Sequence, residues 1–279
     1  MNLHTIDTGF FKLDGGAMFG VVPKTIWNKT NPADENNLCT WAMRCLLVEE
    51  GNRLILIDTG IGNKQDERFF SHYYLHGDAT LDSSLKAKGF HRDDITDVFL
   101  THLHFDHVGG AVMRDGGKLV PAFKNATYWS TQKHWDWAVN PNEREKASFL
   151  KENILPIQES GQLKFVDDNC NVNFTDNINV KFAYGHTESM MLPLIDYQGK
   201  QLLYMADLLP SVGHLPMPYV MAYDMFPLKT LTEKKIILQE ALEKEYILYL
   251  EHDSVNECCT LQLTEKGIRL KETFNLNAI

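Results

Sequence analysis

Four residues that can bind a metal ion lie within six consecutive positions: His102, His104, Asp106 and His107. An apolar run at 98–100 precedes them and a Gly-Gly pair follows. Imidazole fills a hydrophobic core poorly, whereas neutral imidazole and carboxylate are ligands suited to Zn²⁺ and its neighbours. The sequence therefore predicts a metal-binding loop between a strand and a helix. A solvated, histidine-rich turn is the alternative.

Three further candidate ligands follow predicted strands in the second half of the chain. They are His186, Asp207 and His252, which follow predicted strands at 180–184, 201–206 and 246–250. Taken singly, each is more typical of an ordinary surface or core residue. Together with the loop they give five imidazoles and two carboxylates, which is enough to hold two divalent ions and still leave room for a hydroxide.

Predicted strands and helices alternate along the chain, which indicates the α/β class. The first part holds strands at 3–8, 98–100 and within 119–129, a hairpin of 41–48 and 54–57 that turns near 51–52, and helices within 63–89, at 130–138 with Ser130 as cap, and at 142–154. The second part holds strands at 180–184, 191–196 and 201–206, a helix at 230–245, and a last strand at 246–250. We expect the helix at 230–245 to bury Leu231, Ile236, Ile237, Ala241 and Leu242.

Asp58 stands directly after the predicted strand 54–57. A carboxylate at the end of a buried strand is costly unless it is paired. It could orient a metal ligand through a hydrogen bond, or it could simply cap a turn. The residues alone leave both interpretations open.

Two segments that mix Gly or Pro with large apolar residues could cover a pocket. One spans 15–24 and carries Met18, Phe19 and Val21, and the other spans 210–227 and carries Tyr223 and Phe226. Long irregular segments in compact domains are often functional, and these side chains could form an apolar cleft for a substrate. Core or dimer packing is the alternative for each side chain, and a packed connection is the alternative for 15–24.

The composition is that of a globular protein able to build a large core. The chain has 279 residues, 44% of them hydrophobic and 23% charged, and we expect a single domain over 1–279. The net charge of −10 argues against nucleic acid and acidic membrane surfaces as partners. Five cysteines without framework spacing indicate free thiols in a reducing compartment. The absence of a leader and of a long apolar stretch predicts a cytoplasmic protein.

The motifs together resemble the metallo-β-lactamase superfamily over essentially the full chain. The resemblance is carried by the His-x-His-x-Asp-His loop, by Leu-Ile-Asp-Thr-Gly at 56–60, by the stretch 94–102 and by Gly-His-Thr at 185–187. It implies an α/β fold, a four-layer αββα sandwich with the metal site at one edge of the two sheets. It also implies that His102, His104 and His186 bind one metal, that Asp106, His107 and His252 bind the other, that Asp207 bridges them, and that Asp58 orients a metal-binding histidine.

Several residues indicate the branch of the superfamily. Asp207 stands where the best-known β-lactamases have Cys, and the segments 15–24 and 250–253 are similar to the quorum-quenching lactonase and methyl parathion hydrolase group. Two features depart from the family pattern: 188–190 reads Glu-Ser-Met where many members have Pro-Gly-His, and Pro210 replaces a lactonase tyrosine. A phenol that assists the carbonyl would have to come from elsewhere, for example from Tyr223.

The resemblance implies a dinuclear metal-dependent hydrolase that opens a lactone or ester by attack of a metal-bridging hydroxide. N-acyl-homoserine lactones are candidate substrates, and Asp106 is the natural proton carrier to the leaving oxygen. Phosphotriester hydrolysis is the alternative, and a non-catalytic metal-binding protein is the third interpretation. The expected cofactors are two divalent ions per chain, with zinc as first choice. The expected partners are a small-molecule substrate and, by family resemblance, a second copy in a homodimer, with neither nucleic acid nor membrane.

Overall fold

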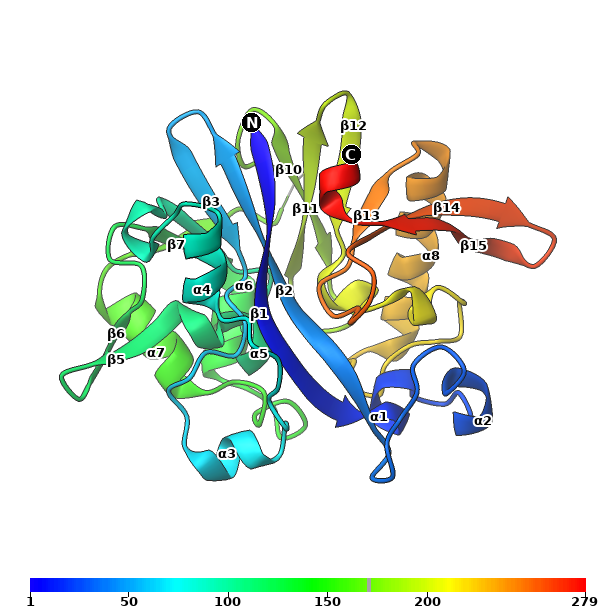
Figure 1. Cartoon of the computed structure of the whole chain (residues 1–279), viewed down its shortest axis with the longest axis horizontal. Helices are drawn as coiled ribbons and strands as arrows, with labels where there is room; N and C mark the ends of the chain where they lie inside the picture. The colour runs from blue at the N-terminus through cyan, green and yellow to red at the C-terminus, as the bar shows by residue number, and fades with distance from the viewer. Residues whose placement is uncertain (170–171) are drawn as a thin grey trace. The chain divides into compact units, whose positions relative to one another are not determined.

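Two long N-terminal strands pass through both compact units of the protein, β1 (Asn2–Asp14) and β2 (Leu38–Glu50). The computed structural model describes residues 1–169 and 172–279. One unit comprises Met1–Gly9 and Met43–Val172, and the other comprises Phe10–Ala42 and Asn173–Ile279. The single domain expected over 1–279 stays a prediction. Figure 1 shows the elements of both units along the chain.

The first unit is built on a six-stranded mixed sheet. The strand order is β1-β2-β3-β4-β7-β8, with β3 (Arg53–Ile57), β4 (Asp97–Phe99), β7 (Thr127–Thr131) and β8 (Leu163–Val166). β2 and β3 form the predicted antiparallel hairpin, whose turn contains Gly51 at a φ of 59°. The next three pairings are parallel, and Ile57 of β3 lies opposite Phe99 of β4. Parallel strands end at the same edge of a sheet, so Asp58 and the loop after β4 emerge together.

Short helices and a hairpin complete the first unit. They are α3 (Glu67–Ser71), α4 (Leu81–Ala87), η1 (Arg92–Asp94), α5 (Phe105–Val108), η2 (Gly109–Ala111), β5 (Val112–Asp115), β6 (Lys118–Pro121), α6 (Gln132–Val139) and α7 (Lys151–Glu159). One apolar core joins sheet and helices: Leu56, Val98 and Tyr128 are buried with Leu85 of α4 and Ile157 of α7. This burial fixes the strands that carry the loop.

The second unit is built on a seven-stranded sheet. The strand order is β15 (Gly267–Phe274), β14 (Cys258–Thr264), β13 (Ile247–Tyr249), β12 (Lys200–Tyr204), β11 (Met190–Tyr197), β10 (Ile178–Ala183) and β9 (Val172–Asn173). β12 and β13 are parallel, whereas β10, β11 and β12 form antiparallel pairs, as do β13, β14 and β15. The apolar residues of β13 are all buried, as expected for a central strand covered on both faces.

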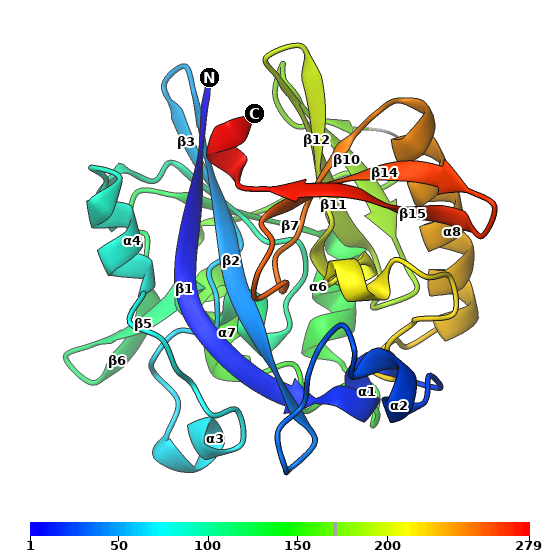
Figure 2. The ribbon, with the colours of Figure 1, turned by 45° about the vertical axis from the view of Figure 1, so that its right-hand side comes forward.

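Helices in the second unit are short except for one. They are α1 (Gly15–Phe19), α2 (Lys24–Trp27), η3 (Ala206–Leu208), η4 (Val212–His214), η5 (Leu276–Ala278) and the long α8 (Pro227–Glu243). α8 packs beside β14 and β15, which Figure 2 shows from a second direction. Its first residue is Pro227, a residue favoured in the first turn of a helix because its missing N–H has no intrahelical partner there.

The α/β class is confirmed, and most predicted elements are present with shifted ends. The helix at 142–154 is wrong: helix α7 occupies Lys151–Glu159 and keeps Pro156 inside it. The loop at 15–24 is partly helical, because Asp14 accepts a hydrogen bond from the backbone N–H of Ala17 and caps α1. The helix after β7 begins one residue later than expected, with Thr131 as its cap. The strand at 246–250 is not the last, since the β14–β15 hairpin follows it.

The buried face of α8 is also different from the prediction. Ile237 and Ala241 are buried as expected, but Ile236 is 62% exposed. Leu231 and Leu242 are half-buried. Lys234, which lies between these positions, is only 1% exposed and takes a place on the inner face. The buried face of α8 therefore includes a lysine and differs from the face that the spacing of apolar residues predicts.

Two further expectations concern the cysteines and a membrane. The four described cysteines, Cys39, Cys45, Cys258 and Cys259, are buried and not in disulfides. Cys170 lies outside the described residues. Within residues 1–169 and 172–279, no helix has the length and apolar character needed to cross a membrane.

Candidate metal centre

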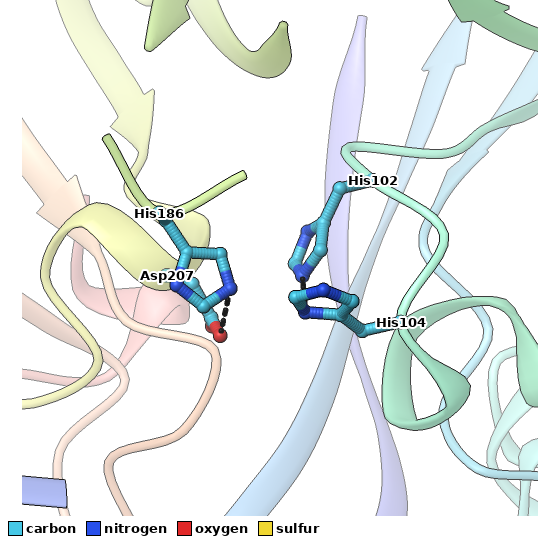
Figure 3. Close-up of side chains that lie close together, drawn as sticks. All are labelled: His102, His104, His186 and Asp207. Carbon is cyan, nitrogen blue, oxygen red and sulfur yellow. Dashed lines mark hydrogen bonds and ion pairs between the residues drawn. The ribbon is translucent and has the colours of Figure 1, made fainter. Parts of the chain in front are cut away.

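The loop after β4 brings three buried imidazoles together within the first unit. His102 and His107 have 0% exposure and His104 has 6%. The ring centroids of His102 and His107 are 3.9 Å apart, and those of His102 and His104 are 4.6 Å apart. His102 Nε2 lies 3.1 Å from His104 Nδ1, and Figure 3 shows the two rings turned toward each other. This is close to the separation of about 3.3 Å between two nitrogens on one tetrahedral zinc.

Asp58 holds two of these rings from the end of β3. Its carboxylate accepts hydrogen bonds from the Thr101 backbone N–H at 2.8 Å and from the Thr101 hydroxyl at 2.7 Å. The same carboxylate lies 3.1 Å from His107 Nδ1, and the Thr101 hydroxyl lies 3.1 Å from His102 Nδ1. Asp58 has a φ of 58°, a strained value for a residue with a side chain. The buried carboxylate is therefore paired with the loop that carries the ligands.

The Gly-Gly pair after the loop allows two backbone segments to approach closely. A Cβ atom at Gly109 would clash with the carbonyl oxygen of Ile61, and one at Gly110 would clash with that of Thr59. Gly110 N–H also donates to Gly60 O at 2.9 Å. Only glycine fits at these two positions, so the pair fixes the ligand loop against the segment that follows Asp58.

Glu145 fixes the third imidazole of the loop. Its Oε1 atom lies 2.9 Å from His104 Nε2, and its Oε2 atom accepts a hydrogen bond from the Trp137 indole N–H at 2.6 Å. Glu145 is 1% exposed. The backbone N–H of Leu103 also donates to His134 Nε2 at 2.8 Å. His104 therefore directs Nε2 toward a carboxylate and presents Nδ1 on the side of His102.

Asp106 lies on α5 between the histidines of the loop. It is 8% exposed, and its Oδ2 atom lies 3.8 Å from His107 Nε2. α5 is a single turn, and His104 is its N-cap residue. The carboxylate and the imidazole of the Asp-His pair thus face the same region of the first unit.

In the second unit, three strand ends bring their candidate ligands together around one carboxylate. His186 Nε2 lies 3.0 Å from Asp207 Oδ2, and His252 Nε2 lies 2.9 Å from Asp207 Oδ1. Figure 3 shows His186 beside Asp207. β12 and β13 are parallel neighbours, with Tyr204 opposite Tyr249, so Asp207 and His252 emerge from the same sheet edge.

Both candidate imidazoles of the second unit are supported at Nδ1, the ring nitrogen that does not face Asp207. His186 Nδ1 lies 2.8 Å from Asp224 Oδ1, and His252 Nδ1 lies 2.7 Å from the carbonyl oxygen of Ala42. Burial alone would lower the pKa of His186, but Asp207 and Asp224 outweigh it and raise that pKa to about 10. Two carboxylates at one buried imidazole form a concentration of negative charge that a divalent cation would neutralise.

The donor sets of both units fit divalent metal ions. Each of the five histidines has one ring nitrogen next to a supporting group, which is Thr101, Glu145, Asp58, Asp224 or the Ala42 carbonyl. A second hydrogen bond that fixes the ring and its tautomer is the usual support for a metal-binding histidine. Imidazole and carboxylate donors together suit zinc and similar ions.

A family model described as the metallo-beta-lactamase superfamily matches residues 44–252. The chain belongs to the metallo-β-lactamase superfamily. A probable metal-dependent hydrolase from Staphylococcus aureus superposes with a TM-score of 0.87 and 27% identity over 98% of each chain. AidC, a dizinc quorum-quenching lactonase solved with a product, superposes with a TM-score of 0.80 and 24% identity over 98% of this chain and 95% of AidC. The expected superfamily and its α/β fold are confirmed, and the expected enzyme class agrees with these hydrolases.

Among curated relatives, the match covers only part of each protein. The N-acyl homoserine lactonase AiiA of Bacillus thuringiensis subsp. kurstaki is 29% identical over 130 residues. That stretch is 43% of this chain and 45% of AiiA, so the chain matches less than half the length of this relative.

The five residues expected to meet substrate differ in their exposure. Met18 is 1% exposed and Phe19 0%, and Phe19 stacks on His214 with ring centroids 4.4 Å apart. Val21, Tyr223 and Phe226 are 91%, 38% and 44% exposed. The first two are therefore core residues of their unit, while the other three present surface. A substrate role stays a prediction for all five.

Two supporting carboxylates were missed in the sequence. Glu145 follows a tryptophan-rich stretch, and Asp224 lies in a segment read only for its aromatic residues. Neither has a fixed spacing from the histidine that it supports: Asp224 is 38 residues from His186, and Glu145 is 41 residues from His104. No local sequence signal could have identified them, because the fold alone creates these contacts.

Proposed function

We propose that the chain is a dinuclear metal-dependent hydrolase that opens lactones or esters, with N-acyl-homoserine lactones as the first substrate class to test. The observation that carries the proposal is the state of the five candidate ligand histidines, His102, His104, His107, His186 and His252, all of which are buried. Each has a supporting group at one ring nitrogen and presents the other, and the carboxylates of Asp106 and Asp207 accompany them. This is a ligand set, since a packing role would not need five separate ring supports.

In this proposal seven side chains form the ligand set of two ions. His102, His104 and His186 would hold one ion, Asp106, His107 and His252 the other, and Asp207 would serve both. Asp207 supports this role in its own unit, because each of its two oxygens already faces a different imidazole. Zinc is the proposed metal, because the donors are imidazoles and carboxylates.

Two bound ions would lower the pKa of a water molecule and polarise the carbonyl of the substrate. The residues of the chain do the remaining work. Asp106, which is almost buried, is placed to carry a proton to the leaving alkoxide oxygen. Asp58, Glu145 and Asp224 keep the imidazoles in one orientation. The exposed side chains of Val21, Tyr223 and Phe226 would contact the acyl part of a substrate.

The relatives support this choice of reaction. AidC is a dizinc lactonase solved with the product N-hexanoyl-L-homoserine, and AiiA is an N-acyl homoserine lactonase. Their low identity or partial coverage makes the substrate class of this chain a matter for experiment. No relative described above is named as a phosphotriesterase, so aryl phosphotriesters enter the test only as a comparison.

The test combines metal analysis with a substrate panel. Protein produced with added zinc is expected to hold about two zinc ions per chain and to hydrolyse N-acyl-homoserine lactones faster than aryl phosphotriesters. Asp207→Asn serves as the site control, since it keeps the side-chain shape but removes the charge. Less than one metal ion per chain, or activity on neither class of compound, would overturn the proposal. Faster turnover of phosphotriesters would overturn the substrate assignment.

A cytoplasmic location is part of the same proposal. Its support is chemical: four buried cysteines are present as thiols, including the adjacent Cys258 and Cys259. Thiols persist in reducing compartments. Fractionation of the cells that make the protein tests the location, and recovery outside the cytoplasm would contradict it.

A further inference from the structure

Helix α8 carries two neighbouring ionisable residues, Glu233 and Lys234, that hold two different segments of the second unit. Glu233 is half-buried and Lys234 is 1% exposed. Neither belongs to the proposed ligand set. A buried lysine is rare unless its charge is compensated by hydrogen bonds, so its contacts require an explanation.

Glu233 holds the turn that leads into His186. Its carboxylate accepts hydrogen bonds from the Tyr184 backbone N–H at 2.9 and 3.1 Å and from the Gly185 backbone N–H at 2.9 Å. A Cβ atom at Gly185 would clash with the backbone nitrogen of Thr230. The last backbone groups before His186 are thus fixed directly against α8.

Lys234 holds the segment that follows Asp207. Its Nζ atom donates to three carbonyl oxygens, those of His214, Pro216 at 2.9 Å and Tyr219 at 3.0 Å. An ammonium group has three N–H donors, so these carbonyls use all of them. Burial lowers the pKa of Lys234 to about 7, and nearby Asp224 opposes that shift.

The segment held by Lys234 connects two parts of the candidate centre. Residues 208–223 run from Asp207 to Asp224, the residue that supports His186. The same segment carries Tyr223, and its Ala222 N–H donates to Ala17 O of α1 at 2.8 Å. His214 also lies 2.9 Å from the carbonyl oxygen of Met18 through Nε2. Lys234 therefore fixes the segment on which the exposed side chain of Tyr223 is presented.

We propose that Glu233 and Lys234 are positioning residues with separate tasks: Glu233 sets the orientation of His186 for metal binding, and Lys234 sets the shape of 208–223 for substrate binding. This inference rests on the proposed function. The chemistry matches each task, because a carboxylate accepts hydrogen bonds from backbone N–H groups and an ammonium group donates them to backbone carbonyls.

The separation of tasks gives each substitution its own signature. Glu233→Gln keeps the size of the side chain but leaves only one oxygen to accept from two N–H groups. It is expected to speed zinc loss to a chelator by about tenfold, the lower end of effects for groups that support metal ligands. Lys234→Met removes the three donors at similar volume. It is expected to raise KM by about tenfold with little change in kcat, as loss of uniform substrate binding does.

The experiment compares these two variants with Lys235→Met and Glu243→Gln, which change exposed residues of the same helix. Zinc loss, limited proteolysis within 208–223 and lactone kinetics are measured on the zinc-loaded proteins. Lys234→Met is expected to be cleaved faster in that segment while it keeps zinc as well as the wild type. The two control variants are expected to match the wild type in every measurement.

Several results would overturn the inference. They are equal changes in zinc loss and KM in both variants, changes no larger than those of the controls, or a lower melting temperature alone. If Lys234→Met does not fold, Lys234→Gln, which retains two donors, takes its place with the same expected direction. Zinc loss and proteolysis need no substrate. A wild type that holds zinc but hydrolyses no lactone would therefore refute the proposed function, while those two measurements still decide the positioning roles.

Discussion

The two units supply their candidate ligands in opposite ways. In the first unit, four ligands lie within six residues of one loop. In the second unit, His186, Asp207 and His252 come from three separate strand ends. The first set needs only a strand, a turn and one helical turn, whereas the second needs long chain segments to return to one place, which carries a greater entropic cost.

The supports of the ligands show the same difference. Asp58 serves two rings of the compact loop, His107 directly and His102 through the Thr101 hydroxyl. In the second unit each imidazole has its own support, Asp224 or the Ala42 carbonyl. A change at Asp58 should therefore disturb two ligands, whereas a change at Glu145 or at a support in the second unit should disturb one. Asp207 is the exception, since it faces two imidazoles.

The largest effect is expected for Asp207→Asn. Loss of the charge that faces both His186 and His252 should lower kcat/KM for lactones by about 1,000-fold, equivalent to about 4 kcal/mol. The zinc content should fall in parallel. Steady-state kinetics and elemental analysis check this outcome, with Asp196→Asn as the control because Asp196 is partly buried on β11. Activity above a tenth of the wild type would show that the dispersed set does not depend on its shared carboxylate.

The next comparison sets Asp58→Asn against Asp224→Asn. Each substitution places an amide next to a histidine Nδ1, but Asp58 supports two rings and Asp224 one. Supporting groups of this kind are worth 10- to 100-fold in metal affinity or activity. We expect Asp58→Asn to lower zinc affinity by about 100-fold and Asp224→Asn to lower it by about tenfold. Competition with a chelator measures both affinities. The reverse order would break the proposed difference between the units.

A smaller effect is expected for Glu145→Gln within the compact loop. Glu145 supports only His104, and its second oxygen binds the Trp137 indole. The loss should be about tenfold in zinc affinity, smaller than that of Asp58→Asn because only one ring is released. Glu143→Gln, on an exposed side chain in the same turn, is the control. If both variants equal the wild type, the compact loop does not need this support.

The smallest effect on activity is expected for Asp97→Asn, at the start of the strand that leads to the loop. Burial alone would raise the pKa of Asp97, but hydrogen bonds from Arg53, Thr96 and Trp129 outweigh it and leave that pKa below its usual value. The substitution should cost about 2 kcal/mol of folding stability at pH 7 while lactone turnover stays within about twofold of the wild type.

The stability difference caused by Asp97→Asn should depend on pH. A lowered carboxyl pKa stabilises the folded state above the unfolded-state pKa of about 3.9 and loses this contribution as pH falls through the folded-state value. Urea unfolding at pH 7 should therefore show the full difference in unfolding free energy between the wild type and Asp97→Asn. Below about pH 4 that difference should become smaller. A difference that grows in acid would contradict the assignment of the charge.

The sequence was most informative where contacts are local. The compact loop, the β2–β3 hairpin and the position of Asp58 after β3 could all be predicted from neighbouring residues. The residues His186, Asp207 and His252 were weak candidates when taken singly, and only the resemblance assigned each of them to a metal. Glu145 and Asp224 could not be predicted, since their partners lie far away along the chain. The burial of Lys234 was not predicted for another reason: the buried face of α8 was predicted from the spacing of apolar residues, and a charged residue does not contribute to that pattern.

The division of the chain between the units also sets the order in which their contacts can form during synthesis. The ribosome delivers Phe10–Ala42 first among the parts of the second unit, and all of Met43–Val172 follows before Asn173 emerges. The first unit can fold at that stage, because domains form as their residues become available. The Ala42 carbonyl must wait for His252, which comes only after the strands β10 to β13. One histidine of the proposed centre thus receives its support late in translation, long after the compact loop can form.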